Sequence, residues 1–442
     1  MRGHQLPFVI LFIGVLNMAL PDIAWGTPVQ VFHGVFLDNV VLVLYLLLVA
    51  TIGRYGSLFR NRDALRFATL VALLASVGIV SAGVNGYTLN DVGEALRLFL
   101  FSAFVMVAVH WSRTFGPAFV LRSYLAGVAA GGVINIYLSV TQPELLIGIL
   151  PVLRSQNGAG GALGIAISLS AWLMLIRRTR SDMTVAIASA LIGTVAAAMS
   201  FSKTSMTIAA CGLIAWFCIL IRAMAARRGR LLGAVGLVGL IAVGTYAWRV
   251  AESSTIAGAV VRSVRTKFTN LDLRDKYSVG ARYMYLWGVA EIVAKHPVAG
   301  VSYSGFYDAI TTTSTYQTGE MADEDPEAGQ RGQPNPHNSF LYYAAANGVL
   351  GLLIVCLLFL LFLGHLWQGV QESGVVGIIV WGCIAMAYVI YGATLPTLFD
   401  TPVLFVPAAV TIALVNRGRL RQGLDDSGPS FEPRVSIATI PT

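Results

Sequence analysis

Long apolar segments alternate with short polar connections along almost the whole chain. Most of these segments approach the length that a helix needs to cross the roughly 30 Å hydrocarbon core of a bilayer. The pattern predicts an all-α polytopic membrane protein with 12 membrane-spanning helices. The predicted spans are Leu6–Ala24, Phe36–Gly53, Phe67–Val84, Ala95–His110, Phe119–Val140, Gly158–Ile176, Thr184–Ser200, Ser205–Ile221, Leu231–Ala247, Ser339–Leu363, Gly374–Ala393 and Pro402–Val415.

The spans divide the chain into four parts. Helices one to nine occupy residues 1–247, one long connection occupies 248–336, helices ten to twelve occupy 337–416, and a polar tail follows at 417–442. No charged segment followed by a small-residue cleavage site stands out near the start. The segment Met1–Leu20 is therefore expected to remain as the first span.

The composition is that of a membrane protein and excludes a soluble one. Of the 442 residues, 56% are hydrophobic and 12% are charged, and the mean hydropathy is +0.72. A soluble protein carries about twice this share of charged residues. The 4 cysteines all fall inside apolar segments, so they are expected to pack between helices rather than to form a disulfide outside the cytoplasm.

Arginines gather in four of the polar segments, at residues 54–66, 177–180, 222–230 and 417–421. With 12 spans, all four lie on one side of the membrane together with both termini. The positive-inside rule makes that side cytoplasmic. The net charge of +8 is then mostly a sign of topology, and nucleic-acid binding is not expected.

The long connection at residues 248–336 then lies outside and contains a further predicted helix. Residues 278–297 are apolar with a few interspersed charges, and about fifteen helical residues are too few to span a bilayer. We expect this helix to lie along the outer membrane interface and to end at Pro297. The acidic stretch Met321–Glu327 is typical of a solvated segment.

Six basic residues break the inward bias of positive charge, because they lie at outer span ends or in the long connection. They are Arg154, Lys203, Arg262, Arg265, Lys267 and Arg282. Snorkelling or a surface ion pair would account for any one of them. Six together favour a shared anionic ligand, since the planar fork of arginine fits phosphate oxygens. Motifs with metal-ligand or nucleotide-binding spacing are not found, so a metal-independent reaction without a cofactor is predicted.

The tenth predicted span begins at a histidine. Asn335 and Pro336 resemble a helix cap followed by proline at the first helical position, which would place His337 in the first turn at the outer mouth. The positive end of the helix dipole and nearby arginines favour a neutral imidazole that can accept a proton. A histidine that only helps to cap the helix is the alternative. Small residues downstream, Ala344–Ala346, Gly348 and Gly351, are expected to allow close helix packing.

These residues also form a recognisable pattern. His337, Asn338 and Leu341, followed by Gly348 and Gly351, resemble the signature of the O-antigen ligase/polymerase superfamily. The preceding stretch resembles the same family through Gly280, Ala281, Arg282, Trp287, His296, Pro297, Gly300 and Phe306. Further resemblances lie at Arg154 with Asn157 and at Ser202-Lys203-Thr204, where the family often has Ser-Arg. Lysine there keeps the charge but loses the two-pronged fork.

The resemblance implies glycan transfer from an undecaprenyl-diphosphate carrier at the periplasmic face of a bacterial inner membrane. It implies His337 and Arg282 as catalytic residues, supported by Asn338. The diphosphate would be bound by Arg265, Arg282, Arg262, Lys203 and Arg154. The expected partners are the lipid-linked glycan donor, a lipid A–core oligosaccharide acceptor and membrane lipids.

The acceptor remains open at this point. A ligase uses lipid A–core, a polymerase extends a second carrier-linked repeat, and a protein O-oligosaccharyltransferase modifies a side chain. One dominant outer loop and a short tail favour the ligase. A lipid or glycan transporter is the alternative from another class, but transporters usually have internal repeats and charges near the bilayer midplane.

Overall fold

The computed structural model describes residues 61–86, 88–141, 156–177, 179–199, 203–225, 285–318, 338–394, 398 and 402–425, with two short strands near the start. The strands, β1 (Gln30–Phe32) and β2 (Val35–Phe36), pair antiparallel. The long helices are α3 (Arg62–Asn85), α4 (Leu89–Thr114), α5 (Pro117–Thr141), α6 (Gln156–Ile176), α7 (Arg180–Met199), α8 (Lys203–Ala225), α15 (Ser339–Val370), α16 (Gly374–Thr394) and α17 (Pro402–Asp425). The shorter elements are α12 (Gly305–Thr311), α13 (Ser314–Thr318), η5 (Gln371–Ser373) and a helix at residues 285–295.

Apart from the short β1–β2 pair, the described residues form a helical polytopic membrane protein, as predicted. Within the described residues, six helices are long and apolar enough to cross a membrane, and two shorter apolar helices accompany them. Every long helix coincides with one of the predicted spans. The first and ninth predicted spans, and the second apart from β2, lie outside the described residues and stay predictions.

Local signals in the sequence explain where several helices begin and end. The side chain of Asn61 caps α3 by accepting hydrogen bonds from the backbone N–H groups of Asp63 and Ala64, both at 3.1 Å. Thr88 and Asp91 form a capping box at the start of α4. Gly86 follows the last residue of α3 and has a φ of 82°. A residue with a positive φ cannot continue a right-handed helix, and glycine adopts this conformation readily, so the helix ends here.

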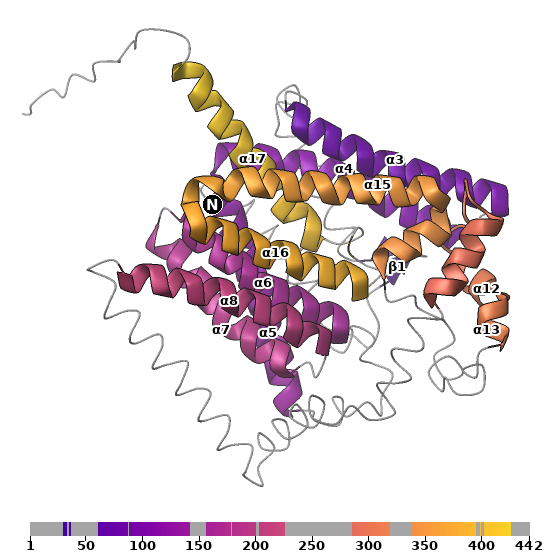
Figure 1. The fold of residues 1–442 in the computed structure, drawn as a ribbon, viewed down its shortest axis with the longest axis horizontal. Coiled ribbons are helices and arrows are strands. Elements are labelled where there is room, and N and C mark those ends of the chain that lie inside the picture. Colours follow the sequence, from indigo (N-terminus) through magenta and orange to yellow (C-terminus); the bar gives the residue numbers. More distant parts are fainter. Residues whose placement is uncertain are drawn as a thin grey trace, which may run out of the picture.

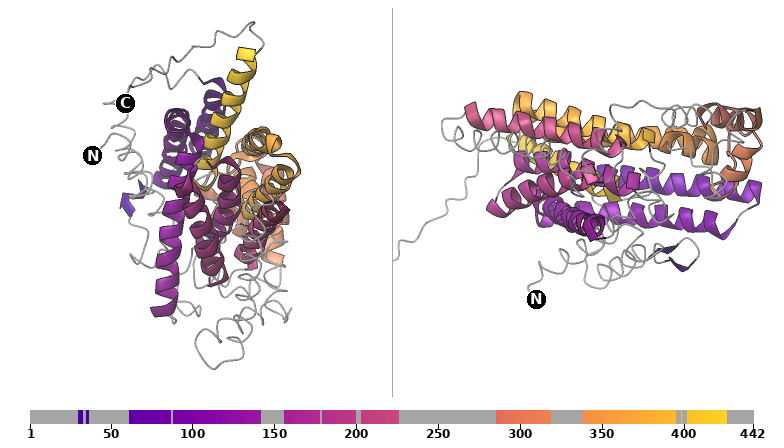
Figure 2. Two further views of the ribbon diagram at one scale, coloured as in Figure 1. Left: turned by 90° about the vertical axis from the view of Figure 1, so that its left-hand side faces the viewer. Right: turned by 90° about the horizontal axis from the view of Figure 1, so that it is seen from below.

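The long helices run side by side through the bundle, as Figures 1 and 2 show. The helix α3 packs against α4, α6 packs against both α7 and α8, and α16 packs against α8. Small residues permit the closest crossings: a Cβ atom on Gly212 of α8 would lie 2.7 Å from the backbone N of Ser168 in α6. Such contacts are typical of membrane helices, whose association depends on close packing rather than on apolar burial from water.

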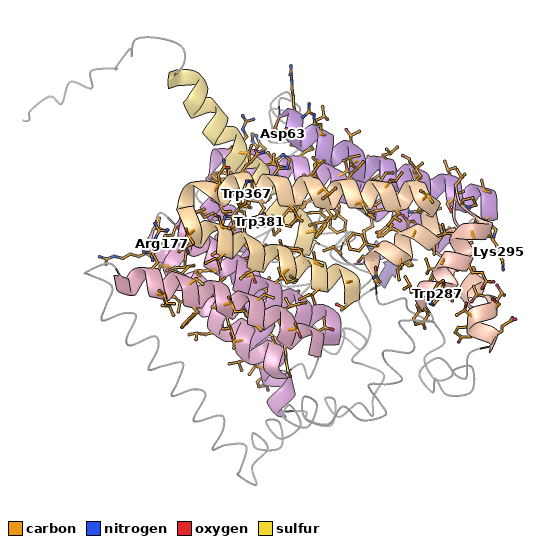
Figure 3. All side chains as sticks on the ribbon, viewed as in Figure 1. Asp63, Arg177, Trp287, Lys295, Trp367 and Trp381 are labelled. Atoms are coloured by element: carbon orange, nitrogen blue, oxygen red, sulfur yellow. The ribbon has the colours of Figure 1, made fainter. Side chains whose placement is uncertain are left out.

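The two ends of the bundle differ in their side chains. At one end Arg122 forms an ion pair with Asp182 at 3.0 Å, and Arg222 donates a hydrogen bond to the backbone oxygen of Ser373 at 2.9 Å. Figure 3 shows Arg177 and Asp63 toward this end and Trp287 and Lys295 at the opposite end. The topology prediction assigned Arg177 and Arg222 to the cytoplasm, and both lie at this end of the described bundle.

The helix α15 is two helices rather than one. Gly348 interrupts it with φ 67° and ψ −167°. The rings of Phe340 and Phe359 contact each other at 5.7 Å between centroids, although a continuous helix would separate them by about 28 Å at 1.5 Å per residue. The chain therefore reverses at Gly348. We name residues 339–347 the short arm and residues 349–370 the long arm; in Figure 1 the short arm lies beneath the right-hand end of the long arm.

The reversal corrects the prediction of a single tenth span. A straight helix of 32 residues would be about 48 Å long, well beyond the roughly 30 Å hydrocarbon core. With the reversal, only the long arm has to cross the bilayer. The short arm folds back along it, at the end of the bundle that also carries α12 and α13 (Figure 1).

Candidate active site

The candidate site lies where the short arm begins. Asn338 is the cap of this helix, and its side-chain oxygen accepts a hydrogen bond from the backbone N–H of Leu341 at 3.0 Å. The sequence predicted a start at Asn335 and Pro336 instead. Because the helix begins only after Asn338, His337 precedes the cap rather than occupying the first turn, and it lies outside the described residues.

The start of the short arm is packed inside the bundle. The buried hydroxyl of Ser339 accepts a hydrogen bond from the backbone N–H of Leu398, in the connection between α16 and α17, at 3.0 Å. The ring of Phe340 lies against Gly392 of α16, where a Cβ atom would approach it to 3.1 Å. The positive end of the short-arm dipole is therefore directed into the bundle, between α16 and the long arm.

The reversal is closed by a segment of the long connection. We name residues 297–303 the clasp. The backbone N–H groups of Val301 and Ser302 donate to the carbonyl oxygens of Ala345 and Ala346, both at 2.9 Å, and the N–H of Val349 donates to Pro297 at 2.9 Å. These bonds satisfy the backbone groups that the interrupted helix leaves without helical partners.

Two glycines make this close approach possible. A Cβ atom on Gly348 would meet the carbonyl oxygen of Val298, and one on Gly300 would meet that of Ala345. Both glycines have a φ of 67°. Pro297, Gly300 and Gly348 were predicted as part of one sequence pattern, and the structure brings them together at the reversal. Gly351 also allows close packing, since its Cβ would lie 2.9 Å from the backbone oxygen of Tyr343.

An apolar cluster anchors the helix at residues 285–295 to the short arm. Tyr285, Val289 and Ile292 are buried on one face of that helix. They pack with Val301, Phe306, Ile310, Ala344 and Ala345. The helix ends before Pro297, as predicted. Trp287, on another face, is about half exposed.

Polar contacts hold the same region to α4. Asp91 is buried, and its carboxylate accepts hydrogen bonds from the backbone N–H and the hydroxyl of Ser304, at 2.8 and 2.5 Å. It also accepts from the backbone N–H and the hydroxyl of Thr88, both at 3.0 Å. The capping-box spacing of Thr88 and Asp91 predicts their mutual hydrogen bonds, but no local pattern predicts the contact with Ser304, which is 213 residues away in the sequence.

A second carboxylate joins the helix at residues 285–295 to α13. Glu291 accepts hydrogen bonds from Lys295 Nζ at 2.8 Å and from the backbone N–H and hydroxyl of Ser314, at the start of α13, at 2.9 and 2.8 Å. The bond from Lys295 and those from Ser314 favour the ionised carboxylate and lower the pKa of Glu291 to about 2. Glu291 therefore remains ionised throughout the physiological pH range.

Arg97 was not among the predicted site residues; it lies in the half of α4 that is nearer to Ser304 and the clasp. Its guanidinium forms an ion pair with Glu94 at 3.1 Å, and its side chain is only 12% exposed. An ionisable residue within a membrane helix is a functional candidate in its own right. The three-residue spacing of Glu94 and Arg97 could have revealed the pair, because such residues share one helix face.

The remaining predicted site residues are only partly described. Lys203 is the first residue of α8. Arg154, Arg262, Arg265, Lys267, Arg282 and His337 lie outside the described residues. Their convergence stays a prediction. Among the described residues, no group of three His, Cys, Asp or Glu side chains could hold a metal ion.

A comparison with known families covers the central part of this architecture. A family model described as O-antigen ligase matches residues 188–356, from α7 to the first turns of the long arm. This region belongs to the O-antigen ligase superfamily. The match confirms the resemblance seen in the sequence, and it identifies a glycosyl-transfer domain of the kind that acts in O-antigen assembly. No curated protein matches the chain.

The O-antigen ligase region contains the elements that define the candidate site. It includes α8, the helix at residues 285–295, the clasp and the short arm with Asn338. The helices α3 and α4 lie before it but contact it, α3 through the hydroxyl of Ser81 and α4 through the carboxylate of Asp91. The site is therefore built from the O-antigen ligase region together with two helices that precede it.

Proposed function

We propose that this chain is a metal-independent, inverting glycosyltransferase of lipopolysaccharide assembly. It would move an O-antigen polysaccharide from undecaprenyl diphosphate to lipid A–core oligosaccharide at the periplasmic face of a bacterial inner membrane. The family match supports the reaction class. The observation that carries the proposal is the short arm, whose N-terminus enters the bundle beside α16 with Asn338 as its cap.

The proposed transfer is a single displacement with His337 as general base. An acceptor sugar hydroxyl attacks the anomeric carbon of the donor while His337 takes the hydroxyl proton. The new glycosidic C–O bond forms as the bond between the anomeric carbon and the phosphate oxygen breaks. Undecaprenyl diphosphate leaves with the bonding electrons, and the anomeric configuration is inverted.

The leaving diphosphate needs positive groups in fixed positions. We propose that Arg265 and Arg282 bind it, with contributions from Arg262, Lys203 and Arg154. The N-terminus of the short arm adds the positive end of a helix dipole on the inside of the bundle. Fixed cations and dipoles of this kind stabilise developing negative charge without reorganisation during the reaction.

The short arm lies beside a part of the long arm whose exposed side chains are suited to contact with membrane lipids. Leu350, Leu353 and Leu357 of the long arm are about half exposed, as befits a lipid-facing side. A donor held in the membrane by its polyprenyl chain could therefore present its diphosphate to the short arm from the outer leaflet. This supports a lipid-linked donor over a soluble one.

The test is transfer by the purified protein with lipid-linked O-antigen and lipid A–core as the only substrates. The wild-type chain and His110→Ala should form a covalent product, because His110 lies in the last turns of α4, at the opposite end of the bundle. His337→Ala should fold but lose transfer by at least a hundredfold. A glycan that grows only on its carrier would make the chain a polymerase. Transfer to protein would replace the acceptor, and movement of substrate without a covalent product would make it a transporter.

A further inference from the structure

We infer that Ser81 of α3 is a positioning residue for the transfer reaction, because it fixes the reversal of α15 and thereby the short arm. The inference rests on the proposed function, in which the N-terminus of the short arm carries the reacting groups. Ser81 lies before the O-antigen ligase region and belongs to none of the motifs in the sequence pattern.

Ser81 connects three parts of the molecule through one hydroxyl group. The residue is fully buried. Its hydroxyl donates a hydrogen bond to the carbonyl oxygen of Ala346 at 2.8 Å and accepts one from the backbone N–H of Ser302 at 2.9 Å. The last turn of the short arm, the clasp and α3 therefore meet at a single oxygen atom.

The face of α3 around Ser81 is shaped for the clasp. Gly78 leaves room for the ring of Tyr303, since a Cβ atom there would lie 2.6 Å from the ring. Asn85, one turn after Ser81, donates to the carbonyl oxygen of Gly300 at 3.1 Å. The hydroxyl of Tyr303 accepts a hydrogen bond from Asn347, the last residue of the short arm, at 2.8 Å. The face of α3 formed by Gly78, Ser81 and Asn85 thus contacts both the short arm and the clasp.

The hydrogen bonds of Ser81 control the position of the start of the short arm. The short arm is about 12 Å long at 1.5 Å per residue, so a tilt of about 5° at the reversal displaces its first residue by about 1 Å. A misplacement of that size lowers an enzymatic rate by about a hundredfold when a catalytic group depends on it. Ser81 hydrogen-bonds to the short arm itself, whereas Asn85 bonds to the clasp, so Ser81 ties the short arm directly to α3.

Removal of the hydroxyl should leave the fold intact. The N–H of Ser302 and the carbonyl oxygen of Ala346 also bond to each other at 2.9 Å, so neither group loses every partner in Ser81→Ala. The clasp then stays paired to the short arm but loses its attachment to α3 at this point. Ser81→Ala should therefore change the position of the short arm without preventing the reversal from forming.

The experiment compares Ser81→Ala with Ser76→Ala on the same helix. The hydroxyl of Ser76 donates only to the carbonyl oxygen of Ala72 in its own helix at 2.9 Å, so it serves as the matched control. We expect Ser81→Ala to lower kcat at least tenfold, with KM for the lipid-linked donor within twofold of wild type and an unchanged melting temperature. Ser76→Ala should match wild type in all three quantities.

A second readout does not depend on activity. Leu341→Cys, on the short arm, is labelled with a membrane-impermeant maleimide, and the unsubstituted chain gives the background from native cysteines. Ser81→Ala should change the labelling rate at least threefold, whereas Ser76→Ala should not. If the proposed function fails, the labelling still reports whether Ser81 positions the short arm.

The outcomes decide the inference in each case. Wild-type kcat and wild-type labelling in Ser81→Ala would overturn it, as would a lowered kcat that Ser76→Ala shares. If Ser81→Ala does not fold, Asn85→Ala carries the test, because it releases the clasp at Gly300 instead. It should reproduce the loss of kcat at constant KM, and a wild-type kcat in that variant would refute the inference.

Discussion

Gly348 is the residue on which the architecture of α15 depends. Its φ of 67° and ψ of −167° lie in a region that is essentially restricted to glycine, and an added Cβ would overlap the carbonyl oxygen of Val298. We predict that Gly348→Ala lowers the stability of the folded protein by about 3 kcal/mol or more. Thermal unfolding in detergent measures this loss.

The control is Gly364→Ala in the same helix. Gly364 lies within the long arm, and a Cβ atom added there would meet no neighbouring part of the described structure within 4 Å. This change should leave the melting temperature unchanged or raise it slightly, since alanine favours a helix by about 1 kcal/mol over glycine. Equal effects of the two substitutions would contradict the reversal at Gly348.

Asp91 joins Ser304, at the start of α12, to α4. Both carboxylate oxygens of Asp91 accept hydrogen bonds, from the N–H and O–H groups of Thr88 and Ser304. An asparagine would replace one of these oxygens with an NH₂ group, which cannot accept a hydrogen bond and would face the N–H donors. We predict that Asp91→Asn destabilises the protein by about 2 kcal/mol or more, because hydrogen bonds to a buried charge are stronger than neutral ones. Asp308→Asn, at an exposed site on α12, should leave the melting temperature within about 1 °C of wild type. A stable Asp91→Asn protein would show that this contact does not hold the region in place.

The proposed diphosphate site predicts different effects for arginine and lysine at the same position. Replacing Arg265 or Arg282 with lysine keeps the charge but removes two-pronged hydrogen bonding, so single-turnover transfer should fall more than tenfold, about 1.4 kcal/mol. Lys203→Arg restores the group that the family resemblance favours and should be tolerated. Wild-type rates in both arginine variants, together with an inactive Lys203→Arg, would contradict the assignment.

At the level of the elements, hydropathy predicted the long helices but not their internal reversal. An apolar pattern records which segments are buried in lipid or protein, and it is the same for a straight helix and a folded one. The pair Asn347-Gly348 inside an apolar segment was the available turn signal. The hydrogen bonds that stabilise the reversal come from residues distant in sequence, such as Ser81 and Val301, so no local pattern could predict them.

The same limit applies to the start of the short arm. Asn335-Pro336 and Asn338-Ser339 are both acceptable helix starts by local preference. The structure uses Asn338, because Ser339 and Phe340 then pack against Leu398 and Gly392. Tertiary contacts therefore decide between two starts that the local sequence leaves nearly equal.

The helix at residues 285–295 carries apolar side chains on its exposed face as well as its buried one. Leu286 and Trp287 are about half exposed, and Val298, just beyond the helix, is 74% exposed. Val298 is continuous with the lipid-facing long arm, because Pro297 pairs with Val349. We predict that this face inserts into the outer leaflet, as an interfacial helix does.

Nitroxide labels at two positions measure this insertion. A label at Leu286→Cys should relax faster with oxygen, which partitions into lipid, than with a water-soluble nickel complex. A label at Lys295→Cys, at the polar end of the helix, should show the opposite preference. Equal exposure of both labels to the nickel complex would place the whole helix in water.

At the scale of the whole molecule, charge predicts which way the bundle faces. Asp63 and Arg177 lie toward one end (Figure 3), where Trp367 and Trp381 also contact each other at 5.2 Å between ring centroids. Lys295 lies at the other end with the clasp and the short arm (Figure 3). Arginine-rich connections stay in the cytoplasm because they resist translocation, so the clasp should face the periplasm.

Labelling in spheroplasts tests this orientation directly. An impermeant maleimide should react with Lys295→Cys in intact spheroplasts, and with Arg177→Cys only after the membrane has been permeabilised. The unsubstituted chain serves as the control for its native cysteines, which lie half-buried within helices. The reverse pattern would place the short arm and Asn338 in the cytoplasm. A donor whose glycan lies on the periplasmic side could not then reach them, so the proposed reaction would be wrong together with the topology.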